Sequence, residues 1–166
     1  MVRSVRIETN TPPDSSAARL AAAAARRIEG RTGIVPAPAG AAEHAVRLEI
    51  GPGAPDGGYR ISVPGPAETV VTAREPDGLA AGAGQFLRDS AFSDGVFEPS
   101  RRPSASAPTS RLRGMYFATH FYNFYHEAPL AEIGEYVEDL ALWGFNTLNV
   151  WFDMHHFAGL ADPAAQ

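Results

Sequence analysis

From Arg111 to its last residue, Gln166, the chain reads RLRGMYFATHFYNFYHEAPLAEIGEYVEDLALWGFNTLNVWFDMHHFAGLADPAAQ. The pattern predicts an apolar strand over residues 112–119, an amphipathic helix over 130–143 and a second apolar strand over 146–152. In this order the three elements form a βαβ unit, whose strands lie parallel in a sheet that needs covering layers on both faces. The stretch after the second strand is short, so we expect the rest of that sheet to come from outside these 166 residues.

The first hundred residues predict a different architecture with its own core. Residues 17–29 have high helix propensity, with Asp14 or Ser15 as the N-cap and Gly30 or Gly33 at the C-terminal end. Strands are predicted near residues 2–7 and over 46–50, 59–63 and 69–73, and a second helix over 79–88. The order β-α-β-β-β-α predicts a small α+β sandwich with antiparallel hairpins and two covering helices.

Two glycine-rich segments add detail to this domain. Residues 51–58, GPGAPDGG, predict a hairpin connection, because they lack phosphate-binding spacing and no helix follows them. Gly82 and Gly84 weaken the second helix intrinsically, so we expect both to allow close packing of that helix against the sheet.

A Pro/Ser-rich segment over 98–110 separates the two regions. It predicts a linker between an accessory domain at 1–97 and the βαβ segment at 111–166. Residues 1–113 carry all 14 basic side chains, every one an arginine, together with 12 acids. Residues 114–166 carry seven acids and no base, so the two regions differ in charge as well as in pattern.

Composition excludes several classes of function. The net charge of −5 gives no basic face for nucleic acid. The absence of cysteine excludes disulfides and thiolate metal sites. No stretch approaches 18 uninterrupted apolar residues, which predicts no membrane span, and the first residues lack a signal-peptide pattern, which favours a cytoplasmic location. No motif predicts a cofactor.

Polar and aromatic side chains follow both strands of the βαβ segment. They are His120, Tyr122 and Asn123 after the first strand, and Trp151, Asp153, His155 and His156 after the second. In a (β/α)₈ barrel, ligands meet the C-terminal ends of the strands, so we expect these two groups to share one rim. Aromatic rings beside hydrogen-bonding groups suit a pyranose, which has an apolar C–H face and a polar edge. The rim therefore predicts a carbohydrate site, and a polar barrel edge that binds nothing is the alternative.

Other chemistries have weaker patterns. His120, Asp153, His155 and His156 include zinc-ligand types, but they lack HxH or HExxH spacing, so no metal site is predicted. Glu127 and Asp153 are the carboxylates to consider for glycoside hydrolysis, and they do not make a convincing acid–base pair.

Several short motifs resemble the start of family 20 β-N-acetylhexosaminidases, with family 67 α-glucuronidases and family 84 enzymes similar in layout. Residues 78–87, GLAAGAGQFL, resemble the helix that ends their small non-catalytic domain. Arg113-Gly114 is similar to the RG that opens their first barrel strand, and Leu148-Asn149-Val150 to their second strand. The resemblance implies a zincin-like domain without zinc, followed by a catalytic (β/α)₈ barrel. This chain departs from the family at Ala118, where the family has an Asp, and at 151–155, where the family has HWH.

The resemblance also implies that the catalytic Asp-Glu pair would lie on a fourth barrel strand, so we expect these 166 residues alone not to hydrolyse glycosides. The leading hypothesis is a non-catalytic N-terminal portion of a carbohydrate-active glycoside hydrolase. A missing barrel segment or a second copy of the chain would then cover the βαβ unit. The alternative is a stand-alone binding or interaction module whose aromatic C-terminal segment pairs with a partner or another copy.

Overall fold

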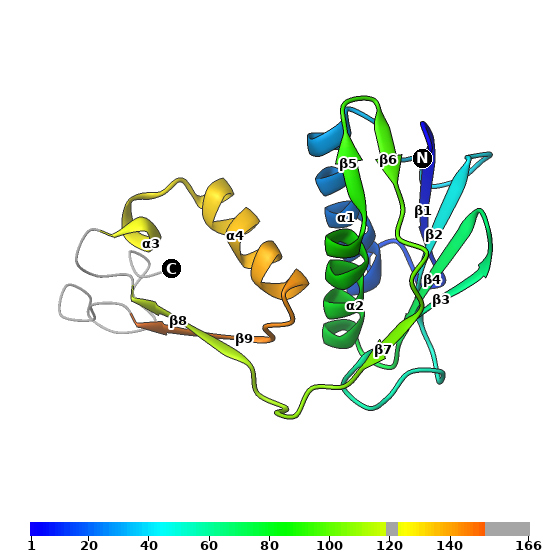
Figure 1. The fold of residues 1–166 in the computed structure, drawn as a ribbon. Coiled ribbons are helices and arrows are strands. Elements are labelled where there is room, and N and C mark those ends of the chain that lie inside the picture. Colours follow the sequence, from blue (N-terminus) through cyan, green and yellow to red (C-terminus); the bar gives the residue numbers. More distant parts are fainter. Residues whose placement is uncertain (119–122, 152–166) are drawn as a thin grey trace.

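The computed structural model describes residues 1–118 and 123–151 (Figure 1). The N-terminal part contains β1 (Val5–Thr9), α1 (Ser16–Thr32), β2 (His44–Ile50), β3 (Tyr59–Gly65), β4 (Glu68–Ala73), α2 (Pro76–Asp89), β5 (Ala91–Ser93), β6 (Val96–Glu98) and β7 (Ser104–Ser106). The C-terminal part contains β8 (Gly114–Ala118), α3 (Phe124–Glu127), α4 (Leu130–Leu142) and β9 (Thr147–Trp151). The expected α+β class is therefore confirmed.

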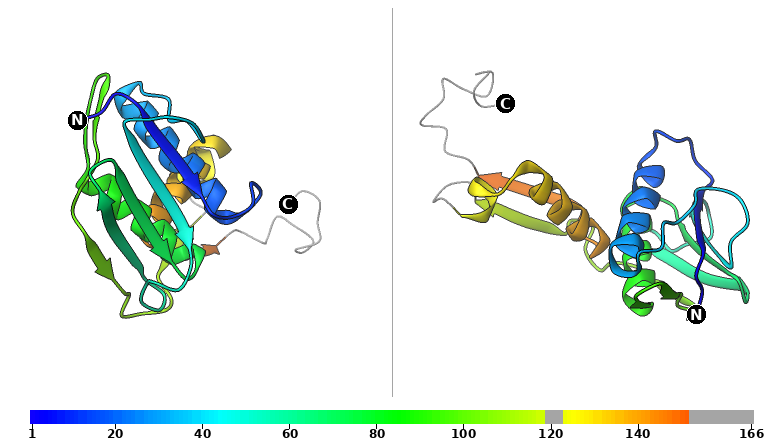
Figure 2. Two further views of the ribbon diagram at one scale, coloured as in Figure 1. Left: turned by 90° about the vertical axis from the view of Figure 1, so that its right-hand side faces the viewer. Right: turned by 90° about the horizontal axis from the view of Figure 1, so that it is seen from above.

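A five-stranded mixed sheet in the order β1-β2-β4-β3-β7 is the base of the N-terminal part. β1, β2 and β4 are mutually parallel, whereas β3 runs antiparallel to both of its neighbours. Helices α1 and α2 lie together on one face of this sheet, and the other face is open (Figure 2). The core fills the layer between helices and sheet, and includes Ile28, Leu48, Val71, Leu79 and Phe86.

The alternation predicted for the second strand places charge on the open face of the sheet. Val46 and Leu48 are buried, while Arg47 lies on the opposite face among the carboxylates of Glu8, Glu49 and Glu68, at 3.7, 2.5 and 3.3 Å. Charged side chains that pair with one another are stable in contact with water, so this face of the sheet needs no further covering layer.

The first helix begins and ends as its sequence predicts. The Ser15 side chain accepts a hydrogen bond from the backbone N–H of Ala18 at 3.1 Å, which makes Ser15 the N-cap. Gly33 ends the helix with a φ of 72°, a left-handed conformation that glycine adopts without a steric penalty.

The strand pairing corrects one prediction. Residues 51–58 do not connect a hairpin, because β2 pairs with β4 in parallel and β3 lies on the far side of β4. The hairpin is formed instead by β3 and β4. Three short strands, β5 to β7, were not predicted, and β7 lies within the Pro/Ser-rich segment 98–110, where it pairs with the edge of β3.

The C-terminal part forms the expected strand, helix and strand. β8 and β9 pair in parallel, and α4 packs between this two-stranded sheet and α2 (Figure 1). Gly144 follows the helix with a φ of 93°, and the backbone N–H groups of Gly144 and Phe145 donate to the carbonyls of Ala141 and Leu140. Among the described residues, no helix combines the length and apolar character needed to cross a bilayer.

A buried histidine holds the segment that leads out of the N-terminal part. His44 is 0% exposed, and its Nε2 lies 3.1 Å from the Thr69 hydroxyl. That hydroxyl donates to the backbone carbonyl of Ser100 at 3.3 Å. Thr69 therefore accepts from Nε2–H of neutral His44. Burial lowers the pKa of His44, the positive charge of Arg101 and the N-terminal amine lower it further, and Glu68 opposes them.

The stability of the chain is expected to fall as the pH drops from about 7.5 to about 5.5 because of His44. Below a pH of about 6.5, His44 becomes protonated in the unfolded chain, whereas in the folded chain its lowered pKa keeps it neutral to a lower pH. The unfolded state then binds more protons than the folded state, and the free energy of unfolding falls by at most about 1.4 kcal/mol per pH unit.

Urea titrations of the wild type and His44→Gln across this range check the expectation. The other histidines contribute equally to both proteins, so the difference between the two stability curves isolates His44. Parallel curves would show that His44 titrates alike in the folded and unfolded chains.

Candidate functional site

The parallel pairing of β8 and β9 brings their C-terminal ends together. Ala118, the last residue of β8, is the register partner of Trp151, the last residue of β9. This is the arrangement expected from the βαβ pattern. The last described residues of both strands therefore lie at the same end of the sheet.

Two of the seven rim residues named from the sequence lie in the described part of the chain. They are Asn123, immediately before α3, and Trp151, which is 59% exposed. His120, Tyr122, Asp153 and His155 lie outside the described residues, as does His156.

Asn123 uses its side chain to build this edge. Its amide oxygen accepts from the backbone N–H of Tyr125 at 3.1 Å, which caps α3. Its amide nitrogen donates to the carbonyl of Ala118 at 2.6 Å. Both polar groups of Asn123 are engaged, so the residue fixes where α3 begins relative to the end of β8.

An aromatic cluster that the sequence did not single out lies beside this edge. The Phe117 ring stacks on Tyr125 with centroids 4.2 Å apart and packs against Tyr136 of α4 at 5.7 Å, and Phe124 contacts both tyrosines. The Tyr125 hydroxyl donates to that of Tyr136 at 3.5 Å. This hydrogen bond raises the pKa of Tyr125, and burial adds to the effect. The cluster joins α3, α4 and β8.

The described residues near this edge do not supply acid–base or metal chemistry. Glu127 ends α3, and Asp153, its candidate partner, lies outside the described residues. Within 1–118 and 123–151, no three His, Asp or Glu side chains come together in a way that could hold a metal ion. What the described edge offers is aromatic side chains, among them Trp151.

The opposite end of β8 and β9 is tied to the N-terminal part through Arg113. Its Nε donates to the carbonyl of Gly144 at 2.6 Å, and its Nη2 lies 3.2 Å from the Asp77 carboxylate. Asn146 donates to the same carboxylate oxygen at 3.2 Å and exchanges hydrogen bonds with the backbone of Arg113. Asp77 thus joins the starts of both strands to the first turn of α2. The RG motif drew attention to Arg113 in the sequence. No pattern predicted its partner Asp77, which lies 36 residues earlier in the chain.

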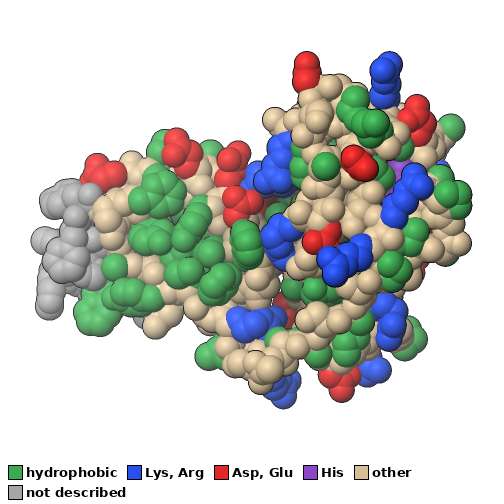
Figure 3. Space-filling view, viewed as in Figure 1, with side chains coloured by type: hydrophobic (Ala, Val, Ile, Leu, Met, Phe, Trp, Pro, Cys, Tyr) green, Lys and Arg blue, Asp and Glu red, His purple; other side chains and the backbone are tan. Residues whose placement is uncertain are grey.

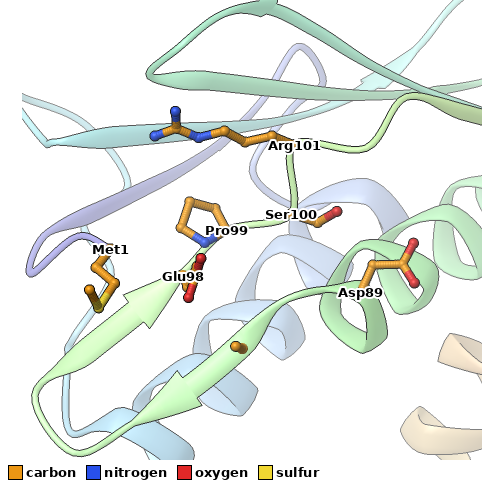
Figure 4. Close-up of a pocket in the computed structure, with 7 residues that line it drawn as sticks. Met1, Asp89, Glu98, Pro99, Ser100 and Arg101 are labelled. Carbon is orange, nitrogen blue, oxygen red and sulfur yellow. The ribbon is translucent and has the colours of Figure 1, made fainter.

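A cavity of about 580 Å³ opens near the N-terminus, away from these strands (Figure 4). Its charged lining residues are Asp89, Glu98 and Arg101. In Figure 4 their side chains point in different directions and do not converge on one position. The cavity therefore lacks the convergent polar groups that a ligand site requires.

Comparison with known proteins places the fold. No protein-family model matches the chain, and a search of the curated proteins finds no match. Solved structures do match. The GH20 β-N-acetylhexosaminidase from Streptomyces coelicolor A3(2) superposes with a TM-score of 0.61 at 20% identity, over 90% of this chain and 31% of that one. The fold is shared with GH20 glycosidases.

Further structures extend the likeness. The GH20 exo β-N-acetylglucosaminidase from Vibrio harveyi, solved with N-acetylglucosamine, gives a TM-score of 0.65 at 14% identity, over 90% of this chain and 22% of its own. A GH138 enzyme targeting pectin rhamnogalacturonan II gives 0.63 at 14% identity, over 89% and 19%. The chain thus spans less than a third of each of these three structures, with a fold that occurs inside glycoside hydrolases.

Proposed function

We propose that this chain is the non-catalytic N-terminal portion of a carbohydrate-active glycoside hydrolase. Residues 1–97 would be its zincin-like accessory domain, and residues 111–166 would open its (β/α)₈ barrel. The observation that carries the proposal is the extent of the GH20 superposition, which covers 90% of the chain and so includes more than the N-terminal domain. The parallel β8-α4-β9 unit is the repeating element from which such a barrel is built.

The rim at the C-terminal ends of β8 and β9 is the part of this chain proposed to meet sugar. Trp151, which is 59% exposed, is proposed to lie against the sugar, and His120, Tyr122, Asp153 and His155 are proposed to supply polar groups beside it. Asn123 is proposed to contribute mainly by fixing α3, because its amide is already hydrogen-bonded on both sides. No cofactor is part of the proposal.

The exposed surface of the βαβ unit supports a role as part of a larger assembly. Figure 3 shows apolar side chains gathered over this half of the molecule. Tyr116, Leu148 and Val150 of the two strands are 49%, 39% and 50% exposed. Exposed apolar strands favour association with further protein, which here is proposed to be the next strands of the barrel.

Sequencing the reading frame beyond the codon for Gln166 tests this function. We expect a continuation of several hundred residues in alternating strands and helices. The continued protein should hydrolyse an aryl N-acetyl-β-glucosaminide or another aryl glycoside, and the 166-residue chain should not. A stop codon directly after Gln166 would overturn the proposal. The stand-alone interaction module would then be favoured, and sedimentation would show whether a second copy covers β8 and β9.

A further inference from the structure

Helix α4 has little to stabilise it within its own βαβ unit. It contains 13 residues, a length at which isolated helices are marginal in water. Pro129 stands at the N-cap without a side-chain hydrogen bond, and Gly134 lies in the helix interior. Glu138 and Asp139 lie near the C-terminal end, where the helix dipole disfavours negative charge, and the last turn contains no basic residue.

Within its own unit, α4 packs on the strands through Tyr136, whose ring lies against Phe117 of β8 with centroids 5.7 Å apart. Leu130 is 86% exposed, and in the described part of the chain only Leu140 and Leu142 of this helix are buried. More of the α4 backbone lies close to α2 than to β8 or β9. The helix is therefore packed mainly against the N-terminal part.

Arginines from α1 and α2 supply the charges that α4 lacks. Arg27 donates to the Asp139 carboxylate at 2.9 Å and to the Glu135 carbonyl at 3.1 Å, and Arg26 pairs with Glu138 at 2.5 Å. The Arg27 side chain is only 17% exposed, so water screens its charge less than that of a free surface arginine. In Figure 3, acidic and basic side chains meet at the boundary between the two parts.

Arg88 completes the C-terminal end of the helix. Its Nη1 donates to the carbonyl of Leu142 at 2.9 Å, and its guanidinium lies 4.3 Å from the centroid of the Trp143 ring. A cation at this position satisfies a carbonyl that the helix leaves unpaired and offsets the negative end of its dipole. Here the cation comes from α2, because the last turn of α4 contains no basic residue.

A missing side chain allows this approach. A Cβ placed on Gly84 of α2 would lie 1.7 Å from the carbonyl oxygen of Leu142. Only glycine lets the two backbones come this close. The N-terminal part therefore presents to α4 both a gap where a side chain would stand, at Gly84, and three arginines. We refer to Arg26, Arg27, Gly84 and Arg88 as the α4 seat.

We propose that the α4 seat is a folding template, on which residues 130–142 become helical and without which they do not. The N-terminal domain would thereby order the first strand–helix–strand unit of the C-terminal part. This surface is complementary to one kind of partner. That partner is a helix with acidic residues near its C-terminal end, whose backbone can lie directly against Gly84. This inference concerns contacts within the chain and does not depend on the proposed glycosidase function.

Hydrogen exchange of the whole chain, followed by mass spectrometry, tests the template. In Arg27→Glu, exchange of the amides in α4 is expected to rise by about tenfold or more, while β2 and β4 keep their protection. The matched control is Arg19→Glu, which makes the same charge change on an exposed residue of α1 that, within the described part of the chain, forms no hydrogen bond or ion pair with α4. The swap Arg27→Glu with Asp139→Arg should restore protection, because it rebuilds the pair with reversed signs.

Salt gives a second, independent measurement on the unaltered protein. Raising sodium chloride from about 0.05 to about 1 M shortens the screening length several-fold. This should weaken the more exposed Arg26–Glu138 pair, whose side chains are 51% and 37% exposed, and speed exchange in α4 but not in β2. Protection of α4 that is unchanged in Arg27→Glu and at high salt would overturn the proposal. So would equal losses in α4 and in the central sheet, since these would mean a general loss of stability.

Discussion

Replacing Gly84 with alanine is expected to lower the free energy of unfolding by about 2–4 kcal/mol. The new Cβ would lie 1.7 Å from the Leu142 carbonyl oxygen, a distance that no rotamer change can relieve because both groups are held by backbone. The two helices must separate by more than an ångström to accommodate it. That movement opens the contact through which Leu142 joins the core of the N-terminal part, and it lengthens the hydrogen bond from Arg88.

Gly30→Ala is the control for this experiment, and it is expected to change stability in the opposite direction. Gly30 also lies within a helix, but a Cβ there would meet nothing within 4 Å. Alanine at an unobstructed helical position should therefore stabilise the chain by about 0.5–1 kcal/mol. Guanidinium titrations followed by circular dichroism would measure both. Equal changes of the same sign in the two variants would show that Gly84 acts through helix propensity rather than through close packing.

The glycines of α2 show how far sequence reasoning could go. Both Gly82 and Gly84 predict close packing, because a helix retains such residues only at some cost. Gly82 does pack on the sheet, with its Cβ position 2.7 Å from Val71 and 2.8 Å from Tyr59. Gly84 packs instead on α4, which corrects the expectation that it faces the sheet. Residues two positions apart in a helix point about 200° away from each other. Gly82 therefore faces the sheet, whereas Gly84 faces α4.

Strand order was the least predictable feature of the N-terminal domain. Local alternation identified β2 and β3 correctly, because side-chain period reports which face is buried, and the residues of 69–73 identified β4. It carries no information on which strands become neighbours. The insertion of β4 between β2 and β3 depends on the whole sheet, and therefore residues 51–58 were wrongly expected to connect a hairpin.

The candidate site was predictable in its placement more than in its chemistry. The helical period of 130–143 and the apolar runs beside it predicted parallel strands, whose C-terminal ends do meet at Ala118 and Trp151. The role of Asn123 as a cap was not predicted, because α3 is only four residues long and has no periodic signal. Likewise the bond between Arg113 and Asp77 depends on tertiary packing, which no local spacing encodes.

Phe97→Ala is expected to be the most damaging single change, at about 3–5 kcal/mol. The Phe97 side chain is 0% exposed and meets the edge of the Phe86 ring at 6.1 Å and the Phe92 ring at 5.3 Å. Its backbone exchanges two hydrogen bonds with Val2, at 2.7 and 2.9 Å. Removing the ring leaves a cavity that α2, β5 and the N-terminal strand segment cannot all close at once.

Phe97→Leu separates this cavity effect from a loss of backbone pairing. A leucine preserves much of the buried volume and leaves both bonds to Val2 possible, so it should cost less than about 1.5 kcal/mol. Urea midpoints of the two variants measure the difference. Equal losses would indicate that the ring geometry, and not the filled volume, holds the β5–β6 hairpin in place. A small loss for both would mean that residues near 97 lie at the margin of the domain, as the composition of 98–110 suggested. The bonds between Phe97 and Val2 and the hydrogen bond from Thr69 to Ser100 argue instead that the domain depends on residues up to at least 100.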